Sequence, residues 1–491
     1  MKRYFLMFAV FLMGFGVIAQ AAYHHEGEAD APKFLQAYPQ LAGTKLDSCT
    51  TCHTGGTYES TPGKFTTVGS CQWCHMTYGY DGSGDITETM NQYGLDYLNA
   101  GRGDVNAFKT IEPLDSDGDG YTNKQEIDAL TYPGDANDNA SKTPAPRVTY
   151  TLQELEAFAH HKEFLLMNTK RSGDFYAEYE GVTLLDLIND AGMATGTTSV
   201  TVFAPDGYSY TYEMNPGGTD YYIDGTYPQA QFYYDVQADA AYGGWCDYSA
   251  PSSTGRNNGD IITVTGGLKL IFAYKRDDAY LESGYLDSQN KLQGEGPFRS
   301  VPPQMVVGPP DQLSTAANQD VIWPYDENAD HNAGFSARTV VAIRVEPLPE
   351  GTTDFDWYEG GWGYVDEQKV IVYGNIANGN VTGTVVNKGT NQPLGDVKIT
   401  SDKGDYVTLT DTNGNFTING LKLGTYTLTA SRINYQPAST TVTVTQGQTQ
   451  MVTLALTSTW NDVMSVYNSY TGGEASWQDV MNCYFAYAEQ Q

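Results

Sequence analysis

The chain has 491 residues, and 59 acidic residues against 27 basic ones give it a formal net charge of −32 at pH 7. This charge argues against nucleic acid and anionic membrane surfaces as partners, because both would repel the chain. The length allows three or four domains. With 52 glycines, 37 tyrosines and only 18% charged residues, the composition predicts a multidomain, β-rich α+β protein.

The first segment of the chain has two basic residues followed by an apolar run over residues 4–19. Ala19 and Ala21 are small residues at −3 and −1 of a signal peptidase site, so we expect residues 1–21 to be a signal peptide. An uncleaved membrane anchor is the alternative, but the run is short for a span of about 20 residues. The sequence predicts an extracytoplasmic protein (periplasmic, secreted or at the outer cell surface) with no transmembrane segment in the mature chain.

The segment 22–110 carries two hexapeptides of the same form, SCTTCH and SCQWCH. In each, a C-x-x-C pair is followed at once by histidine, the pattern of covalent haem attachment. Paired thiols are oxidised outside the cytoplasm unless something consumes them, and addition to haem does so. We expect a small helical dihaem cytochrome c region, with a zinc site or disulfides as alternatives. The predicted thioether residues are Cys49, Cys52, Cys71 and Cys74, and the predicted proximal iron ligands are His53 and His75.

Each haem iron then needs a distal ligand or keeps an open position. We expect one ligand from the pair at 24–25 and one from the pair at 160–161, although solvated surface pairs are the alternative. Met76 is a weaker candidate, because it adjoins a predicted proximal ligand. Two histidines per iron leave no position for substrate and suit electron transfer. The distal candidates are His24, His25, His160, His161 and, in reserve, His331.

The run DSDGDGYTNKQE, residues 115–126, matches the calcium loop D-x-D-x-D-G-x-x-N-x-x-E. A calcium ion explains this density of acids, which would otherwise repel one another; a solvated acidic turn is the alternative. Pro113 argues against a full incoming helix, so we expect a single EF-like loop of structural role within residues 111–142. GDANDN, residues 134–139, is a candidate for a second, weaker site. The predicted calcium ligands are Asp115, Asp117, Asp119, the backbone carbonyl of Tyr121, Asn123 and Glu126.

Residues 148–349 change to alternating strands with one helical stretch, which predicts an α+β domain. The run SVTVFAPDGYSYTYEM predicts a β-hairpin that turns at Asp206-Gly207. The run GVTLLDLINDAG has apolar residues at helical spacing and predicts a helix that ends at Gly192. Two further runs, GGLKLIFAYKRD and RTVVAIRVEP, predict buried strands.

The segments YEGVTLLDLINDAG, VTVFAPDGYSYTY, LKLIFAYKRD and GEGPFRSVPPQ follow in an order that resembles the molybdopterin-binding fold of the sulfite oxidase superfamily. The resemblance implies a cysteine thiolate on molybdenum before the helix, but residues 165–182 contain no cysteine and Cys246 lies well after the helix. We therefore expect a scaffold without this cofactor. Glu295 and Arg299 are then structural, or they shape a docking surface or small-molecule pocket, where Arg299 could bind an oxyanion.

A second resemblance includes the N-terminal run FLQAYPQLAGTKLDSCTTCHTGG. Together with it, residues 23–349 resemble the bacterial GEGP motif-containing diheme proteins, because attachment motifs, calcium loop and GEGP segment occur in the expected order. This resemblance implies a secreted bacterial c-type protein with two covalently bound haem c groups.

Residues 350–379 are predicted to be a linker, and residues 380–457 show period-two alternation broken by Asn-Gly and Gly-Thr turns. The alternation predicts one small β-sandwich. The segment resembles the carboxypeptidase regulatory-like domain, most clearly in DTNGNFTINGLKLGTYTLTA. It contains no histidine and no cysteine, so adhesion, spacing or docking is the expected role.

The tail, residues 458–491, contains the repeat WNDVMSVYNSY and WQDVMNCYFAY. Apolar residues at helical spacing predict two short amphipathic helices that pair as a hairpin. Cys483 is expected to be a buried thiol, and a disulfide between Cys483 and Cys246 is the alternative in an oxidising compartment.

The motifs together predict an exported dihaem c-type cytochrome that carries electrons, with a structural calcium site. Its expected partners are redox proteins or an extracellular electron acceptor. Two other readings stay open at this point. One is a haem-fed redox enzyme with its active site in the GEGP domain, and the other is a surface-binding or adhesion protein whose haems sense redox state.

Overall fold

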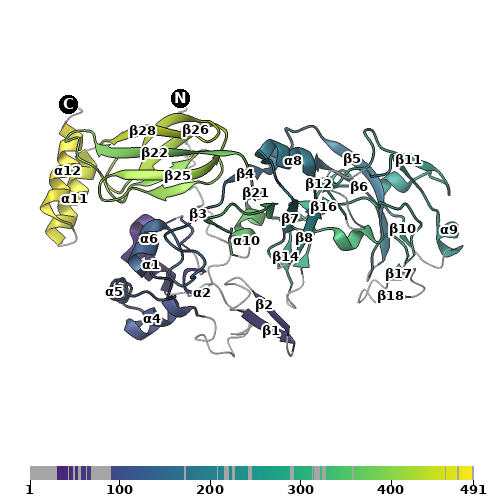
Figure 1. Cartoon of the computed structure of the whole chain (residues 1–491), viewed down its shortest axis with the longest axis horizontal. Coiled ribbons are helices and arrows are strands. Elements are labelled where there is room, and N and C mark those ends of the chain that lie inside the picture. Colours follow the sequence, from purple (N-terminus) through teal and green to yellow (C-terminus); the bar gives the residue numbers. More distant parts are fainter. Residues whose placement is uncertain are drawn as a thin grey trace, which may run out of the picture.

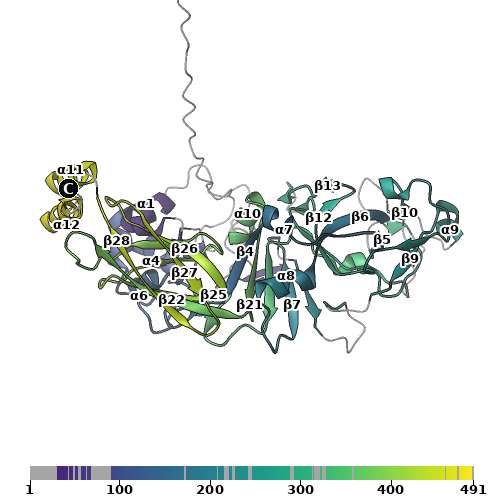
Figure 2. The ribbon, with the colours of Figure 1, turned by 90° about the horizontal axis from the view of Figure 1, so that it is seen from above.

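The structure is a computed structural model of residues 1–491. The predicted signal peptide lies outside the residues that it describes. The described part is elongated, with two helices of the tail at one end (Figure 1, Figure 2). The described residues are 30–42, 44–47, 50–53, 57–61, 64–67, 90–170, 173–206, 208–214, 221–223, 227–241, 246–287, 292–311, 313–314, 321–322, 328–355, 359–458, 460–472 and 475–488.

The described residues between 30 and 142 form a small domain, here called the N-terminal helical domain. Side-chain oxygens of Asn91, Asp104 and Thr122 accept backbone N–H groups and so begin three of its helices. An aromatic core joins the helices, and the rings of Tyr97 and Phe108 stack with centroids 3.9 Å apart. Its elements are α1 (Asp30–Ala37), η1 (Pro39–Leu41), α2 (Thr50–His53), β1 (Thr57–Thr61), β2 (Lys64–Thr67), α4 (Gln92–Gly101), α5 (Val105–Thr110) and α6 (Asn123–Ala129).

Residues 143–376, the middle domain, contain two sheets that share one core. The predicted helix is α8 (Leu184–Ala191), which begins at the cap residue Thr183 and ends at Gly192 with a φ of 94°. The predicted hairpin is the antiparallel pair β7–β8. The first sheet contains, in spatial order, β4 (Arg147–Thr151), β21 (Lys369–Gly374), β19 (Ala342–Glu346), β7 (Ser199–Phe203) and β8 (Ser209–Glu213).

The second sheet is centred on the antiparallel pair β6–β12. Val202 from the first sheet, Phe272 from the second and Leu187 from α8 are fully buried in the core between them. The second sheet contains β5 (His161–Met167), β6 (Asp174–Thr183), β10 (Cys246–Asp247), β12 (Ile271–Arg276), β13 (Ala279–Tyr280) and β16 (Arg299–Val301). Short elements of this domain are β3 (Thr143–Pro144), α7 (Leu152–Leu155), β9 (Ala230–Phe232), α9 (Val236–Ala241), η4 (Pro251–Ser253), β11 (Ile261–Thr263), β14 (Tyr285–Leu286), β15 (Leu292–Gln293), β17 (Leu313–Ser314), β18 (Val321–Ile322), η5 (Asn332–Phe335) and β20 (Thr352–Thr353).

The prediction of a linker at residues 350–379 is wrong. This segment contributes α10 (Glu359–Asp366) and β21, which pairs with β4 and β19 inside the first sheet. Val370 and Val372 are fully buried in the main core. The apolar run of β21 is short and has glycine-rich, acidic sequence before it. Its burial depends on strands that are distant in the sequence, which local pattern does not reveal.

Residues 378–456 form a β-sandwich, as predicted, with one sheet of β28-β22-β25 and another of β24-β23-β26-β27. The first of these sheets continues into the middle domain, because Leu421 of β25 pairs with Arg147 of β4. A salt bridge of 2.6 Å between Lys422 and Asp190 supports this junction. The strands are β22 (Asn378–Asn387), β23 (Lys398–Ser401), β24 (Val407–Leu409), β25 (Asn415–Lys422), β26 (Gly424–Ser431), β27 (Ala438–Val444) and β28 (Thr449–Leu456).

The tail repeats form the helical hairpin of α11 (Trp460–Gly472) and α12 (Trp477–Ala488), which pack through a small core that includes Val466 and Cys483. The N-terminal helical domain lies beneath the sandwich in Figure 1, and Lys398 donates to the backbone oxygen of Ala42 at 2.8 Å. Every helix in the described part of the chain is too short or too polar to span a bilayer.

Candidate functional site

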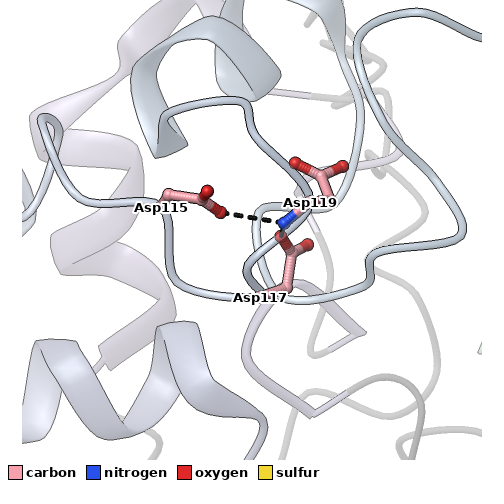
Figure 3. Close-up of side chains that lie close together, drawn as sticks. All are labelled: Asp115, Asp117 and Asp119. Carbon is pink, nitrogen blue, oxygen red and sulfur yellow. Dashed lines mark hydrogen bonds between the residues drawn. The ribbon is translucent and has the colours of Figure 1, made fainter.

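Three aspartates of the predicted calcium loop lie together on the turn between α5 and α6 (Figure 3). Carboxylate oxygens of Asp115, Asp117 and Asp119 lie within 4.8 Å of one another. Asp115 holds the loop in shape by accepting the N–H groups of Gly118 at 2.8 Å and Gly120 at 3.0 Å. Gly120 has a φ of 99°, a conformation that favours glycine, and so permits the sharp turn.

Helix α6 brings a fourth carboxylate to this loop. Thr122 and Gln125 form a reciprocal cap at the start of α6 and fix the helix directly after the turn. The next residue, Glu126, is 0% exposed, and neither oxygen of its carboxylate has a hydrogen-bond partner. Burying a carboxylate without a partner is strongly unfavourable, so Glu126 makes this loop a candidate cation site.

The carboxyl groups of the loop perturb one another. Burial and then the charges of Asp117 and Asp119 raise the pKa of Glu126 to about 9. Burial and the charge of Asp119 raise the pKa of Asp117 to about 6. One oxygen of Asp117 and one of Asp119 are also buried without a partner. A bound cation reverses both shifts because it stabilises the ionised carboxylates, and a donor set made only of oxygens suits calcium.

The remaining predicted loop ligands are the backbone carbonyl of Tyr121 and the side chain of Asn123. Tyr121 lies at the end of the turn, and its N–H donates to Asp119 at 2.9 Å. Asn123, predicted as the ninth-position ligand, is 0% exposed, and its amide donates to the backbone oxygen of Ile111 at 2.8 Å and to Ser116 at 2.9 Å. Its side-chain oxygen accepts the N–H of Ser116 at 3.3 Å. Asn123 therefore braces the loop from inside.

The segment 134–139 does not form a second site of its own. Among the described residues, the three loop aspartates are the one group of acids, histidines or cysteines close enough to share an ion. Asp138 of this segment is instead linked to α6: the N–H of Thr131 donates to the carbonyl oxygen of Glu126 at 2.9 Å, and the N–H of the next residue, Tyr132, donates to the Asp138 carboxylate at 3.1 Å. The spacing of the motif does not indicate this position of Asp138.

The first haem-attachment motif ends on the helical turn α2. Cys52 and His53 occupy adjacent positions there and are both half-buried. Asn91 donates its backbone N–H to the carbonyl oxygen of Cys52 at 2.8 Å. Helix α4 crosses α2 at Gly94, where a Cβ atom would lie 2.8 Å from that same oxygen. The backbone of α2 is thus packed closely on α4 while both functional side chains keep exposed surface.

The surroundings of Cys52 fit a covalently bound cofactor. Tyr93 lies in the same core, is 0% exposed, and its hydroxyl has no hydrogen-bond partner among the described groups. Burial, then the nearby Tyr38 and Cys52, raise the pKa of Tyr93 well above its ordinary value. A polar group of a bound haem would satisfy this hydroxyl, and a half-buried thiol remains accessible for thioether formation.

The second attachment motif and part of the first lie outside the described residues. So does the pair of histidines that we favour for one distal position. The roles expected for these residues remain predictions from the sequence. The predicted residues outside the described part are Cys49, Cys71, Cys74, His75, Met76, His24 and His25.

The described distal candidates lie in the middle domain, away from α2 (Figure 1). His160 has both ring nitrogens engaged, with Glu180 at 3.1 Å and the backbone oxygen of Glu156 at 2.6 Å. His161 on β5 contacts the buried Glu163 at 3.2 Å. His331 is 3% exposed and contacts Asp311 at 3.2 Å. The structure does not bring any of these three to His53.

The GEGP segment contains an ion-pair cluster in which Arg299 is buried and Glu295 is half-buried. Glu295 accepts from Arg276 at 2.6 Å and from Arg299 at 2.7 Å. Arg299 also donates to Tyr179 at 3.0 Å and to Ser336 at 2.8 Å. Burial alone would raise the pKa of Glu295, but the charges of Arg299 and Arg276 outweigh it and lower the pKa to about 2. These contacts give Glu295 and Arg299 a structural role.

The disulfide between Cys246 and Cys483 is not formed. Both thiols are buried, Cys246 on β10 of the middle domain and Cys483 on α12 of the tail, and these elements lie at opposite ends of the molecule (Figure 1). Burial raises the pKa of Cys246 well above its ordinary value. The Cys483 thiol donates to the backbone oxygen of Asn434 at 3.3 Å. Each cysteine is thus packed within its own domain.

Comparison with known families identifies one part of this strand-rich, multidomain protein. The carboxypeptidase regulatory-like domain model matches residues 380–457, which coincide with the β-sandwich. This segment is therefore a carboxypeptidase regulatory-like domain. No curated protein matches the sequence.

Similarities to solved structures are weak. The Bacillus anthracis TIE protein is 13% identical over 18% of this chain and 18% of its own, with a TM-score of 0.16. The minor pilin GBS52 of Streptococcus agalactiae is 21% identical over 24% of this chain and 58% of its own, with a TM-score of 0.15. The group B streptococcus pilus 2b backbone protein is 12% identical over 65% of this chain and 96% of its own, with a TM-score of 0.15. Such TM-scores are too low to indicate a shared overall fold.

Proposed function

We propose that the protein is an exported dihaem c-type cytochrome that transfers electrons at or outside the cell envelope. The repeated CxxCH motif carries this proposal, and the half-buried Cys52 and His53 on α2 support it. Bound haem supplies an iron that changes its oxidation state by one electron. The attaching residues are Cys49 and Cys52 for one haem, and Cys71 and Cys74 for the other, with His53 and His75 on the irons.

The distal ligand of the haem at Cys52 comes from His24 or His25 in this proposal. The described histidines favour this choice, because His160, His161 and His331 each contact a carboxylate of the middle domain. Two histidines on each iron would leave no open position, which favours an electron carrier over an enzyme. The ion pair between Arg299 and Glu295 also favours an electron carrier, because the charge of Arg299 is already balanced and is not available to bind an anionic substrate.

A calcium ion in the loop of α6 is the structural part of the proposal. The support is Glu126, a fully buried carboxylate with two unpartnered oxygens beside three loop aspartates. The ion would fix α6 against the rest of the N-terminal helical domain, because Ile127, next to Glu126, belongs to the aromatic core.

The partners in this proposal are redox proteins or an extracellular electron acceptor. The sandwich and the tail hairpin would serve docking, and the tail exposes aromatic side chains, with Trp460 at 49% and Trp477 at 52%. The acidic chain favours a basic or neutral partner surface.

Visible and near-infrared spectroscopy of the purified, exported protein tests the electron-carrier function. We expect two low-spin haems per chain, a peroxidase-active band after denaturing electrophoresis, and a mass increased by two haem groups. A high-spin haem that binds added ligands would favour an enzyme instead. A mass equal to that of the bare chain would end the cytochrome proposal.

Cysteine variants locate the haems. We expect the double variant Cys49→Ala, Cys52→Ala to retain one haem, and Cys71→Ala, Cys74→Ala to retain the other. Cys246→Ala is the matched control, because this thiol is buried in the middle domain and should leave both haems in place.

A further inference from the structure

The two oxygens of the Asp138 carboxylate have different surroundings. Its Oδ2 atom accepts from the ammonium group of Lys45 and from the N–H of Tyr132 at 3.1 Å. Its Oδ1 atom is buried and has no hydrogen-bond partner, and the residue is 6% exposed. Two successive backbone N–H groups link Asp138 to Glu126, because Thr131 donates to the carbonyl oxygen of Glu126 at 2.9 Å and Tyr132 donates to the Asp138 carboxylate. An unpartnered oxygen beside the acidic loop is thus supplied from outside the loop.

Lys45 connects Asp138 to the first haem-attachment helix. Its ammonium lies 4.5 Å from the ring centroid of Tyr132, which packs in the aromatic core. The neighbouring residue Leu46 is 0% exposed, and its carbonyl oxygen accepts from the hydroxyl of Thr51 at 3.0 Å. Because Thr51 belongs to α2, the position of Lys45 is coupled to the helical turn that carries Cys52 and His53.

A second contact joins the same segment to α2. Gly134 packs directly on Asn91, where an added Cβ atom would lie 2.3 Å from the side-chain nitrogen. That nitrogen donates to the carbonyl oxygen of Thr51 at 3.2 Å, and the side-chain oxygen accepts the N–H of Gly94 at 2.9 Å. The segment that contains Asp138 therefore supports α2 at two independent points.

We propose that Asp138 is a ligand of the calcium ion bound by Asp115, Asp117, Asp119 and Glu126, and that this ion positions α2 for haem attachment. The second half of this inference rests on the proposed haem function, and the first half does not. With Asn123 turned inward, Asp138 supplies the additional oxygen that a calcium ion needs. The ion would also hold Asp138 in place, and so keep Lys45, in the segment before α2, and Asn91, which contacts Gly134 and Thr51, in position beside α2.

Calcium titration of the full chain tests the ligand. Binding would be followed by calorimetry, and by terbium luminescence excited through the tyrosines near the loop. We expect Asp138→Asn to weaken calcium binding about tenfold or more, because a charged ligand is lost. Asp128→Asn is the matched control: it removes the same charge from an exposed position of α6 and should change the affinity less than about twofold. Equal affinities of the two variants would overturn the assignment of Asp138.

Hydrogen exchange of residues 44–53 tests the coupling. We expect calcium to slow exchange in this segment of the wild type. Lys45→Met should still bind calcium, at least as tightly as the wild type because a cation that pairs with Asp138 is removed, but should lose most of that protection. Lys33→Met, on α1, is the control and should keep it. Unchanged exchange on calcium addition in a chain that binds the ion would overturn the coupling.

The two proposals fail separately. If the chain carries haem but residues 44–53 do not respond to calcium, the coupling is wrong and the cytochrome function stands. If they respond to calcium in a chain without haem, the calcium site stands and the cytochrome function is wrong. If the chain binds no calcium at millimolar concentration, both the site and the coupling are wrong.

Discussion

Two glutamates, the half-buried Glu295 of the middle domain and the buried Glu126 of the N-terminal helical domain, have opposite electrostatic surroundings. Glu295 lies between Arg276 and Arg299, whose charges outweigh the effect of burial and lower its pKa to about 2. Glu126 lies beside the loop aspartates, and burial together with their charges raises its pKa to about 9.

The difference shows where each domain obtains its counter-charge. In the middle domain, two arginine side chains supply the counter-charge for the carboxylate of Glu295. The N-terminal helical domain gathers carboxylates, and in the proposed calcium site a cation from solution would supply their counter-charge. We therefore expect the stability of the N-terminal helical domain to depend on calcium, and the stability of the middle domain to be independent of it. Four predictions follow this contrast, in order of decreasing effect.

Removing Glu295 should have the largest effect. In Glu295→Gln, Arg276 and Arg299 face each other without their shared carboxylate, and we expect a loss of about 4 kcal/mol in the free energy of unfolding of the middle domain. Urea unfolding followed by hydrogen exchange in residues 271–301 measures it. Glu282→Gln changes an exposed glutamate of the same domain and should be nearly neutral. Equal losses in both variants would show that the ion pair is not the source of the stability.

Acid should remove the same contribution. The pKa of Glu295 falls from 4.5 to about 2 on folding, so its ion pairs stabilise the fold fully above pH 4.5 and lose that effect as the pH falls towards 2. The contribution is about 3 kcal/mol. The measurement is the stability difference between wild type and Glu295→Gln at several pH values. We expect a constant difference above about pH 5 that shrinks towards pH 2; a constant difference over the whole range would contradict the assignment.

Calcium should stabilise the domain that contains Glu126 but not the domain that contains Glu295. We expect calcium at about 100 times its dissociation constant to stabilise the N-terminal helical domain by about 2.7 kcal/mol in the wild type. Glu126→Gln should lose this gain, yet be at least as stable as wild type in chelator, because glutamine need neither bury a charge nor take up a proton on folding. Thermal melts with calcium and with chelator give the comparison. Retention of the full calcium effect in Glu126→Gln would exclude it as a ligand.

Gly134→Ala should have the smallest of the four effects. The new methyl group would displace the Asn91 side chain, which holds Thr51 and caps α4, and we expect a loss of about 1 kcal/mol. Hydrogen exchange in α2 and α4 should become faster. Gly363→Ala, on α10, places its methyl group where no atom lies within 4 Å and should be neutral or slightly stabilising. Faster exchange in both variants would point to a general loss of stability.

The sequence alone determined the features whose cause is local. The twelve-residue acidic loop, the helix that ends at Gly192, the hairpin at β7–β8, the tail hairpin and the sandwich all follow from residues close in the chain, since caps, turns and side-chain periodicity act over one or two turns of backbone. The CxxCH motifs belong to the same group, because the spacing of two thiols and an imidazole is itself the signal.

Only the tertiary structure decided which distant residues meet. It placed β21 inside a sheet between β4 and β19, turned Asn123 into the core of its loop, and set Asp138 against Lys45, 93 positions away. Such contacts depend on how whole elements pack, and packing maximises burial and hydrogen bonding over the entire chain at once. Local pattern shows which side chains can bind a cation, and the fold decides which of them face it.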